Sequence, residues 1–132
     1  MFIDTSVIVA LLAKEPDAGE FAERISRADH RFTSGLVILE ASMRLSTLLD
    51  IDPVLVETRI RALLSEADIQ LMPIDGEIAT LSVAAFAVYG KGRGHPAQLN
   101  LADCMSYACA KVRGLPLLFK GKDFSRMDIA VA

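Results

Sequence analysis

The sequence predicts an α/β fold with a central, mostly parallel β-sheet that is covered by helices on both faces. Short strand-like runs alternate with helix-periodic segments along all 132 residues, and strands that are separated by helices pair in parallel. Hydrophobic residues make up 52% of the chain, which is enough to fill one core. No repeat or linker interrupts the alternation. We therefore expect one domain over residues 1–132.

Two strands and four helices are expected in the first half of the chain. In order, they are a strand at residues 2–4, helices at 6–13 and 17–27, a strand at 31–33, and helices at 35–49 and 53–67. Thr5 or Ser6 can cap the first helix, and Pro16 ends it. Pro53 suits the first turn of the last helix. The inner face expected for that helix consists of Leu55, Ile60, Leu63 and Leu64.

The second half is expected to complete the sheet. A strand at residues 69–74 is followed by a helix that Asp75 caps and that runs to residue 89. The segment GKGRGHPAQ at 90–98 contains three glycines and a proline, which indicates a loop with unusual backbone freedom. The last elements are a helix at 100–112, a strand at 116–119 and a further short strand near 129–131. The residues of the last helix that are available for burial are Leu101, Cys104, Met105, Ala108 and Val112.

Composition argues against a membrane or secreted protein. The longest uninterrupted apolar runs, residues 7–13 and 83–89, are far shorter than the roughly 18 to 20 residues that a membrane span requires. Asp4 would interrupt the apolar part of a secretory signal. We therefore expect a cytoplasmic protein with no membrane association.

The cysteines and histidines form no recognisable zinc motif. Cys104 and Cys109 are five positions apart in a predicted helix, so they point to different faces and are expected to be buried free thiols. His30 and His95 are too few and too far apart in the sequence to indicate zinc.

Four acidic residues interrupt segments that otherwise look apolar or strand-like: Asp4, Glu40, Asp103 and Asp123. Asp4 ends the first strand, and polar groups at the carboxyl ends of strands form the usual sites of open α/β sheets. Burying an unpaired carboxylate costs several kcal/mol, so we expect the four acids to converge on cations. Because oxygen ligands suit Mg²⁺ or Mn²⁺ best, these are the metals predicted.

Each of these acids also has a simpler structural interpretation. Glu40 could pair with Arg44 one turn later. Asp103 could be a first-turn acid that the helix dipole favours, and Asp123 could cap a turn. Asp128 is a fifth candidate, for which a turn acid is the simpler interpretation.

Basic residues gather in the last third of the chain. The formal net charge is −3, yet residues 90–126 contain seven lysines and arginines against two acids, a local balance of +5. A basic field around a carboxylate cluster suits an enzyme that attracts a phosphate backbone and cuts it. The cations expected to contact the phosphates are Lys91, Arg93, Lys120, Lys122 and Arg126.

Four blocks of the sequence, in this order, resemble the PIN-domain ribonucleases of the VapC toxin type. The blocks are FIDTSVIVALL, VILEASMRL, GKGRGHPAQLNLADCMSYACAK and PLLFKGKDFSRMDI, and they cover both ends and the middle of the chain. The resemblance implies a three-layer α/β/α sandwich, Mg²⁺- or Mn²⁺-dependent endoribonuclease activity, a homodimer, and control by a cognate antitoxin. It also places the family's four acids on Asp4, Glu40, Asp103 and Asp123, with Ser6 and Asn100 as supporting polar groups.

Other interpretations are weaker. A phosphatase of the haloacid dehalogenase type would need a second Asp two residues after Asp4, where Ser6 stands instead, and a receiver domain would need adjacent acids early in the chain. Two alternatives remain within the fold, namely an RNA-processing nuclease without an antitoxin and a catalytically silent PIN-like binding module. The presence of all four acids disfavours the silent module. The sequence does not indicate which RNA would be cut.

Overall fold

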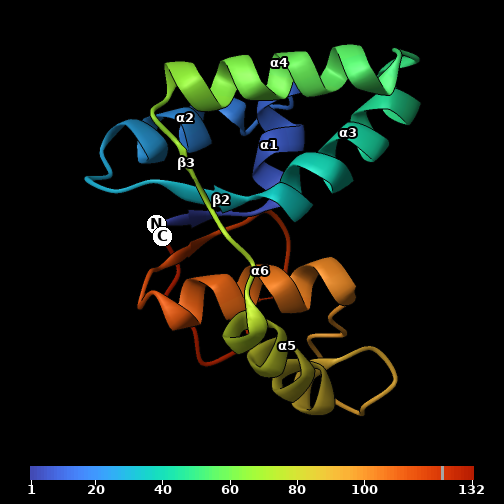
Figure 1. The fold of residues 1–132 in the computed structure, drawn as a ribbon, viewed down its shortest axis with the longest axis vertical. Helices are drawn as coiled ribbons and strands as arrows, with labels where there is room; N and C mark the ends of the chain where they lie inside the picture. The colour runs from blue at the N-terminus through green and yellow to red at the C-terminus, as the bar shows by residue number, and fades with distance from the viewer. Residues whose placement is uncertain (123) are drawn as a thin grey trace.

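The computed structural model of the chain describes residues 1–122 and 124–132, so the predicted site acid Asp123 lies outside the described residues. The elements are β1 (Phe2–Ile3), α1 (Thr5–Leu12), α2 (Ala18–Ser26), β2 (Phe32–Ser34), α3 (Gly35–Leu49), α4 (Pro53–Glu66), β3 (Gln70–Met72), α5 (Gly76–Tyr89), α6 (Leu101–Val112) and β4 (Leu117–Leu118) (Figure 1). The predicted order of strands and helices is confirmed, and α3 has the predicted bounds.

The strands form one parallel sheet in the order β3-β2-β1-β4. Helices α1, α2, α3 and α4 lie on one side of this sheet, and α5 and α6 lie on the other (Figure 1). The predicted three-layer α/β/α arrangement is therefore confirmed. The strand expected near residues 129–131 is reduced to a single bridge between Leu117 and Val131.

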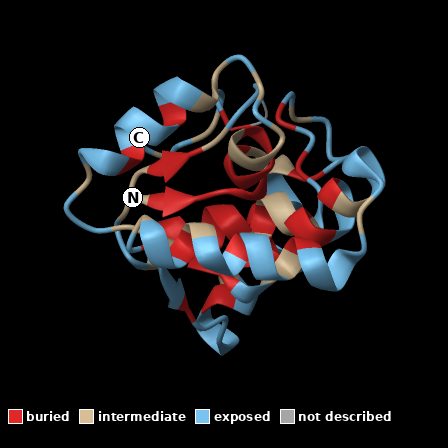
Figure 2. Ribbon diagram, turned by 90° about the horizontal axis from the view of Figure 1, so that it is seen from above, coloured by how far each residue is buried: buried red, intermediate tan, exposed pale blue. Residues whose placement is uncertain are grey.

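The core lies on both faces of the sheet. Strands β1 and β4 are completely buried, with Phe2, Ile3, Leu117 and Leu118 at 0% exposure, and the burial colouring shows red strands between helices whose outer faces are exposed (Figure 2). Cys104 and Cys109 are free thiols in this core, as predicted. Burial raises the pKa of the Cys109 thiol to about 11, so it stays protonated at neutral pH.

One predicted helix cap is wrong. Asp4, and neither Thr5 nor Ser6, caps α1: its backbone is extended and its carboxylate accepts a hydrogen bond from the Ser6 amide. The sequence could not separate these three polar neighbours, because each residue type is a good cap. The cap at Asp75 is confirmed, since its carboxylate accepts from the Ile78 amide at 3.1 Å.

The buried faces of two helices also differ from expectation. In α4 the buried positions are Val56, Ile60 and Leu64, whereas Leu55 is 58% exposed. In α6 Leu101 is 71% exposed. A spacing of four residues puts Val56, Ile60 and Leu64 on one stripe, and the neighbouring leucines fall outside it. Both helices therefore leave apolar side chains at the surface.

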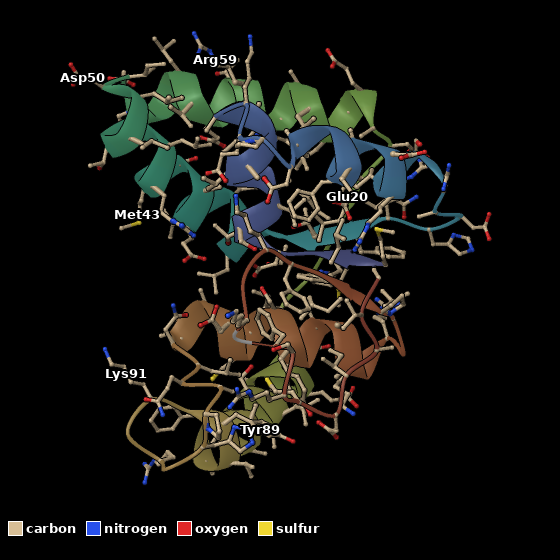
Figure 3. All side chains as sticks on the ribbon, turned by 180° about the vertical axis from the view of Figure 1, so that it is seen from behind. Glu20, Met43, Asp50, Arg59, Tyr89 and Lys91 are labelled. Atoms are coloured by element: carbon tan, nitrogen blue, oxygen red, sulfur yellow. The ribbon has the colours of Figure 1, made fainter. Side chains whose placement is uncertain are left out.

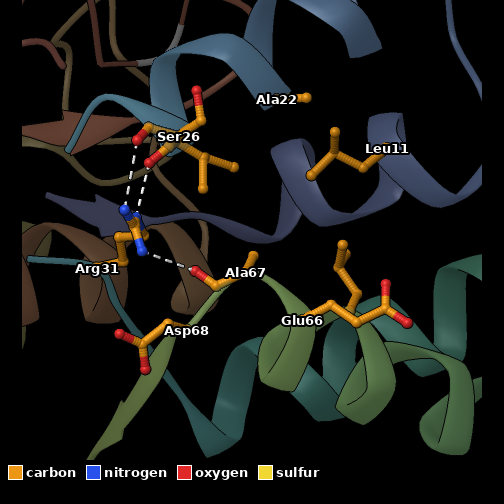
Figure 4. A pocket seen from close by; sticks show the side chains of 9 residues that line it. Leu11, Ala22, Ser26, Arg31, Glu66, Ala67 and Asp68 are labelled. Atoms are coloured by element: carbon orange, nitrogen blue, oxygen red, sulfur yellow. Dashed lines mark hydrogen bonds between the residues drawn. The ribbon is translucent and has the colours of Figure 1, made fainter.

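Arg31 ties α2 to α4 at the back of the molecule. Its Nε donates to the Ile25 carbonyl at 2.7 Å and its Nη1 donates to the Ala67 carbonyl at 3.1 Å (Figure 4). These carbonyls lie at the ends of the two helices, where backbone acceptors lack partners within the helix. The guanidinium borders a cavity of about 320 Å³ and fastens the two helix ends together.

The C-terminal segment folds back onto α5 and α6 through Asp128. One carboxylate oxygen of Asp128 accepts from the hydroxyls of Tyr89 at 3.0 Å and Tyr107 at 2.8 Å. The other accepts from the Lys111 ammonium at 2.9 Å. Hydrogen bonds from Lys111 and Tyr107 lower the pKa of Asp128 to about 2, so the carboxylate stays charged at neutral pH. Its interpretation as a simple turn acid is thus incomplete.

None of the helices in the described part of the chain is both long and apolar enough to cross a bilayer.

Candidate active site

A polar cavity of about 360 Å³ opens at the edge of the sheet where the strands end. It is lined by Asp4, Thr5, Ser6, Glu40, Arg44, Asn100, Asp103, Lys120 and Phe124. Asp4 directly follows β1, Glu40 stands on α3 after β2, and Asp103 stands in the first turn of α6. Three of the four predicted site acids therefore line one cavity. The fourth, Asp123, lies outside the described residues.

Asp4 is buried, with only 5% of its surface exposed, and both of its carboxylate oxygens accept hydrogen bonds. Oδ1 accepts from the Ser106 hydroxyl at 2.7 Å. Oδ2 accepts from the Ser6 hydroxyl at 2.6 Å and from the Ser6 amide at 3.0 Å. Three donors on one carboxylate offset its desolvation and prevent it from rotating. Asp4 is therefore held in one orientation at the floor of the cavity.

The hydroxyl of Ser6 links Asp4 to the opposite wall. While it donates to Asp4, it accepts a hydrogen bond from the backbone amide of Lys120 at 2.9 Å. Lys120 lies two residues after β4, which is an edge strand of the sheet. Ser6, predicted as a supporting group, thus connects the start of α1 to the chain that leaves β4.

Glu40 is oriented by a threonine from the neighbouring helix. Its Oε2 accepts from the hydroxyl of Thr5, the first residue of α1, at 2.6 Å. Among the described residues Glu40 forms no ion pair with Arg44, the partner that a surface interpretation of Glu40 would require. Arg44 lines the cavity beside it. The Thr5 bond thereby holds the Glu40 side chain against the start of α1, next to the residue that follows Asp4 in the sequence.

Asp103 and Asn100 form a capping box at the start of α6. The Asn100 side chain accepts from the Asp103 amide at 2.9 Å, and Asp103 Oδ2 accepts from the Asn100 amide at 2.9 Å. The positive end of the helix dipole favours a carboxylate at this position. Asp103 therefore has both roles at once: its carboxylate stabilises the start of α6, as the helix-dipole interpretation predicts, and it also lines the cavity.

The sequence analysis gave no role in this site to Ser106, Arg44 or Phe124, and it considered Thr5 only as a polar residue at the end of the first strand and a possible helix cap. Ser106 gave the clearest signal, because it lies three positions after Asp103 and so on the same face of α6. It is only 3% exposed, and a buried serine hydroxyl in an apolar helix needs an acceptor. Arg44 was considered only as a surface partner of Glu40.

The predicted RNA-binding cations are distributed unevenly. Of these five, Lys120 is the one that lines the described cavity, and its ammonium bonds to Glu15 and, at 3.0 Å, to Asp17. Lys91 and Arg93 lie in the loop at residues 90–98, where the Arg93 guanidinium stacks 4.9 Å from the centre of the Phe86 ring. Contact with RNA stays a prediction for all five.

The donor set of the cavity suits a hard divalent cation. Its oxygens come from carboxylates and hydroxyls, and neither histidine nor cysteine is among the lining residues of the described part. Among the described residues no three acids, histidines or cysteines are grouped tightly enough to hold an ion between them. The three acids Asp4, Glu40 and Asp103 share one cavity, and the fit to Mg²⁺ or Mn²⁺ rests on the chemistry of their oxygens and not on their spacing.

Comparison with known proteins decides the family. The model of the PIN domain matches residues 1–130. The chain belongs to the PIN-domain family. It is 43% identical over 133 residues to ribonuclease VapC30 of Mycobacterium tuberculosis, covering 98% of this chain and 96% of the relative. It is 40% identical over 129 residues to ribonuclease VapC28 of the same organism, covering 98% and 95%. Within the PIN domains, the chain therefore belongs to the VapC group.

Solved structures show the same fold at low sequence identity. Mycobacterium tuberculosis VapC20, described as a toxin that cleaves the sarcin–ricin loop, superimposes with a TM-score of 0.78 at 16% identity, covering 99% of this chain and 97% of that one. A toxin–antitoxin complex from Klebsiella pneumoniae gives a TM-score of 0.73 at 22% identity, covering 99% and 95%. The predicted PIN fold is confirmed.

The bonds of Asp4 lead to a prediction about stability. If the only effect of Asp4→Asn were to relieve repulsion among the clustered acids, the variant would be more stable than the wild type. We expect the opposite, a loss of about 1 to 2 kcal/mol in the free energy of unfolding, because both oxygens of Asp4 accept hydrogen bonds and an amide offers only one acceptor. Urea unfolding without divalent metal measures the change.

The matched control is Asp52→Asn in the cap of α4. There both amide donors, from Val54 and Leu55, bond to the single oxygen Oδ1, so asparagine can replace aspartate with almost no loss. An Asp4→Asn protein as stable as the wild type or more stable would contradict the prediction.

Proposed function

We propose that this protein is a metal-dependent endoribonuclease that acts as the toxin of a toxin–antitoxin pair. One observation carries the proposal: Asp4, Glu40 and Asp103 line one cavity at the edge of a PIN-fold sheet. The names of the VapC ribonucleases that share about 40% of its sequence support the same activity. We include Asp123 as the fourth acid of the set, on the evidence of the sequence alone.

In the proposed reaction, the chain positions a metal and a phosphodiester. A bound Mg²⁺ or Mn²⁺ supplies the positive charge that polarises the phosphate and makes water acidic enough to attack it. Asp4, Glu40 and Asp103 are the proposed ligands. Ser6 and Ser106 hold Asp4 in place, Thr5 orients Glu40, and the Asn100 box orients Asp103. Prior orientation of these groups lowers the cost of assembling the site.

RNA is proposed to reach the cavity across the basic part of the surface. Lys120 and Arg44 line the cavity itself, while Lys91, Arg93, Lys122 and Arg126 are proposed to contact the flanking phosphates. Arg93 is held over the Phe86 ring, which limits its freedom before RNA binds.

We place the antitoxin on a groove between α3, α4 and β3. The groove has a volume of about 360 Å³, and Ile38, Leu39, Val54 and Leu71 supply its apolar lining. Val54 is 68% exposed, so this surface lacks a cover within the described chain. An extended or helical antitoxin segment fits such a groove. An arginine on that segment could enter the acidic cavity and pair with its carboxylates in place of metal.

We place the homodimer contact on a second apolar surface, formed by α5 and α6. A hollow of about 390 Å³ there is lined by Ala79, Ser82, Val83, Phe86, Leu101, Cys104 and Met105. Val83 is 70% exposed and Leu101 is almost equally exposed. Exposed apolar patches of this kind mark protein interfaces.

The first prediction of this proposal concerns metal removal. EDTA should abolish cleavage of total RNA, and Mg²⁺ or Mn²⁺ should restore it, because the cavity offers oxygen ligands suited to these ions. Asp103→Asn should reduce the cleavage rate by at least about 100-fold, whereas Asp52→Asn should leave it unchanged. Cleavage that persists in EDTA would exclude the metal-dependent mechanism, and a fully active Asp103→Asn protein would refute the site assignment.

The second prediction concerns the basic loop. In the Asp103→Asn background, which should bind RNA without cutting it, Lys91→Gln should reduce the slope of log affinity against log salt by about one unit. Arg59→Gln is the control, since Arg59 lies on α4 at the opposite end of the molecule from Lys91 (Figure 3). Equal slopes for the two variants would assign Lys91 to the ordinary solvated surface.

The third prediction separates the two apolar surfaces. Val54→Lys should weaken antitoxin binding by about 10-fold or more and leave the dimer intact, because it puts a charge in the α3–α4 groove. Val83→Lys should dissociate the dimer and spare antitoxin binding. Light scattering and calorimetry measure the two effects, and each variant is the control for the other. If both effects appear in one variant, the two assignments are wrong.

A further inference from the structure

Asp128 joins three parts of the chain that are distant in sequence. Its Oδ1 accepts from Tyr89 at the end of α5 and from Tyr107 in the middle of α6. The Lys111 ammonium bonds both to Oδ2 at 2.9 Å and to the Asp128 carbonyl at 2.6 Å. Two hydroxyls and one ammonium on a single side chain require a carboxylate, since an amide has one acceptor oxygen only.

The segments that meet at Asp128 are the two that flank the acidic site. Tyr89 directly precedes the loop at residues 90–98, whose base is closed by a bridge between Gly90 and Leu99 and which leads into Asn100 of the capping box. The ring of His95, within this loop, packs edge-on against Tyr89 at 4.8 Å. Figure 3 shows Tyr89 and Lys91 at the same end of the molecule. The position of Tyr89 therefore sets the position of the basic loop.

On the other side, Asp128 ends the segment that forms a wall of the cavity. Lys120 and Phe124 of this segment line the cavity, and Phe124 packs edge-on against Phe119 at 5.0 Å. The near end of the segment is fixed by the bond from the Lys120 amide to Ser6. Asp128 fixes its far end, so the cavity wall is held at two points.

We propose that Asp128 is a positioning residue of the ribonuclease: through Tyr89, Tyr107 and Lys111 it holds the basic loop at 90–98 and the described part of the cavity wall, residues 119–122 and 124–127, in one arrangement. This inference rests on the proposed function, because the purpose of the arrangement is to present cations from both segments to one RNA backbone. Asp128 does not line the cavity and is assigned no part in the chemical step.

A purely structural role and a positioning role give different results. A structural tie would change the stability of the whole protein and leave the handling of RNA unchanged at temperatures well below unfolding. A positioning residue would release the two segments while the rest of the fold stays closed, and it would raise KM more than it lowers kcat.

The test compares Asp128→Asn and Asp128→Ala with Asp52→Ala, which removes an aspartate cap on the far side of the sheet. Amide hydrogen exchange of the free protein should be at least about 10-fold faster in residues 90–98 and 119–127 of both Asp128 variants, and unchanged there in Asp52→Ala. KM for RNA should rise about 3- to 10-fold with kcat within about 2-fold of the wild type. Loops as protected as in the wild type, or kinetic constants equal to those of Asp52→Ala, would overturn the proposal.

Tyr89→Phe separates the two segments and keeps the proposal testable if Asp128→Ala fails to fold. It removes one hydroxyl from Asp128 and retains the ring that contacts His95, so exchange should accelerate in 90–98 but not in 119–127. Faster hydrogen exchange in both segments of Tyr89→Phe, or in neither, would contradict the proposal that Tyr89 connects the loop at 90–98 to Asp128. If the wild type neither cuts nor binds RNA, the proposed function fails on its own, and hydrogen exchange in the free protein still decides whether Asp128 holds the two segments.

Discussion

The burial of the Asp4 carboxylate is the constraint on which the rest of this site depends. A buried charge at the junction of β1 and α1 must find donors, and it finds them on Ser6 in α1 and on Ser106 in α6. Since α1 and α6 lie on opposite sides of the sheet, one side chain ties the two helical layers together at the carboxyl edge (Figure 1). Ser6 extends the tie to Lys120 beyond β4. The hydrogen bonds that make Asp4 tolerable in the core are therefore those that place the walls of the cavity.

The site acids also serve the local structure. Asp4 caps α1 and Asp103 belongs to the capping box of α6, so both stand where the first amides of a helix need acceptors. The partial positive charge at these helix ends reduces the cost of bringing carboxylates together before any cation arrives. Glu40 lies inside α3 and caps no helix, so its carboxylate is oriented by the hydrogen bond that the Thr5 hydroxyl donates. The hydrogen bonds that orient these three acids are therefore also bonds that the fold itself requires.

Much of this architecture could be predicted, and the failures have a common origin. The alternation of elements, the bounds of α3 and the gathering of Asp4, Glu40 and Asp103 followed from hydrophobic pattern and from acids in apolar segments. The contacts between the helical layers could not be predicted from these patterns. The places of Ser106 and Thr5 near Asp103 and Asp4 in the sequence give a hint, but their bonds to Asp4 and Glu40 join residues more than thirty positions apart and do not follow from a local pattern. Asp128 looked like a turn acid because its partners, Tyr89 and Tyr107, belong to other helices. Leu55 and Leu101 were assigned to the core because a periodic pattern does not by itself show which apolar side chains the neighbouring elements cover.

The exposed leucines and the acidic cavity meet along one edge. Glu40 and Asn100 line the cavity, and they also border a shallow hollow of about 270 Å³ whose remaining lining is Leu36, Leu39, Met43, Leu101 and Ala102. Apolar surface of this kind is stabilised by contact with another protein, whereas the cavity beside it is lined by three acids and suits a cation. A protein that covers the hollow therefore touches Glu40 itself and Asn100, the residue that orients Asp103. Because Glu40 of α3 and Asn100 at the start of α6 line both surfaces, a protein bound in the hollow would contact residues of the site directly.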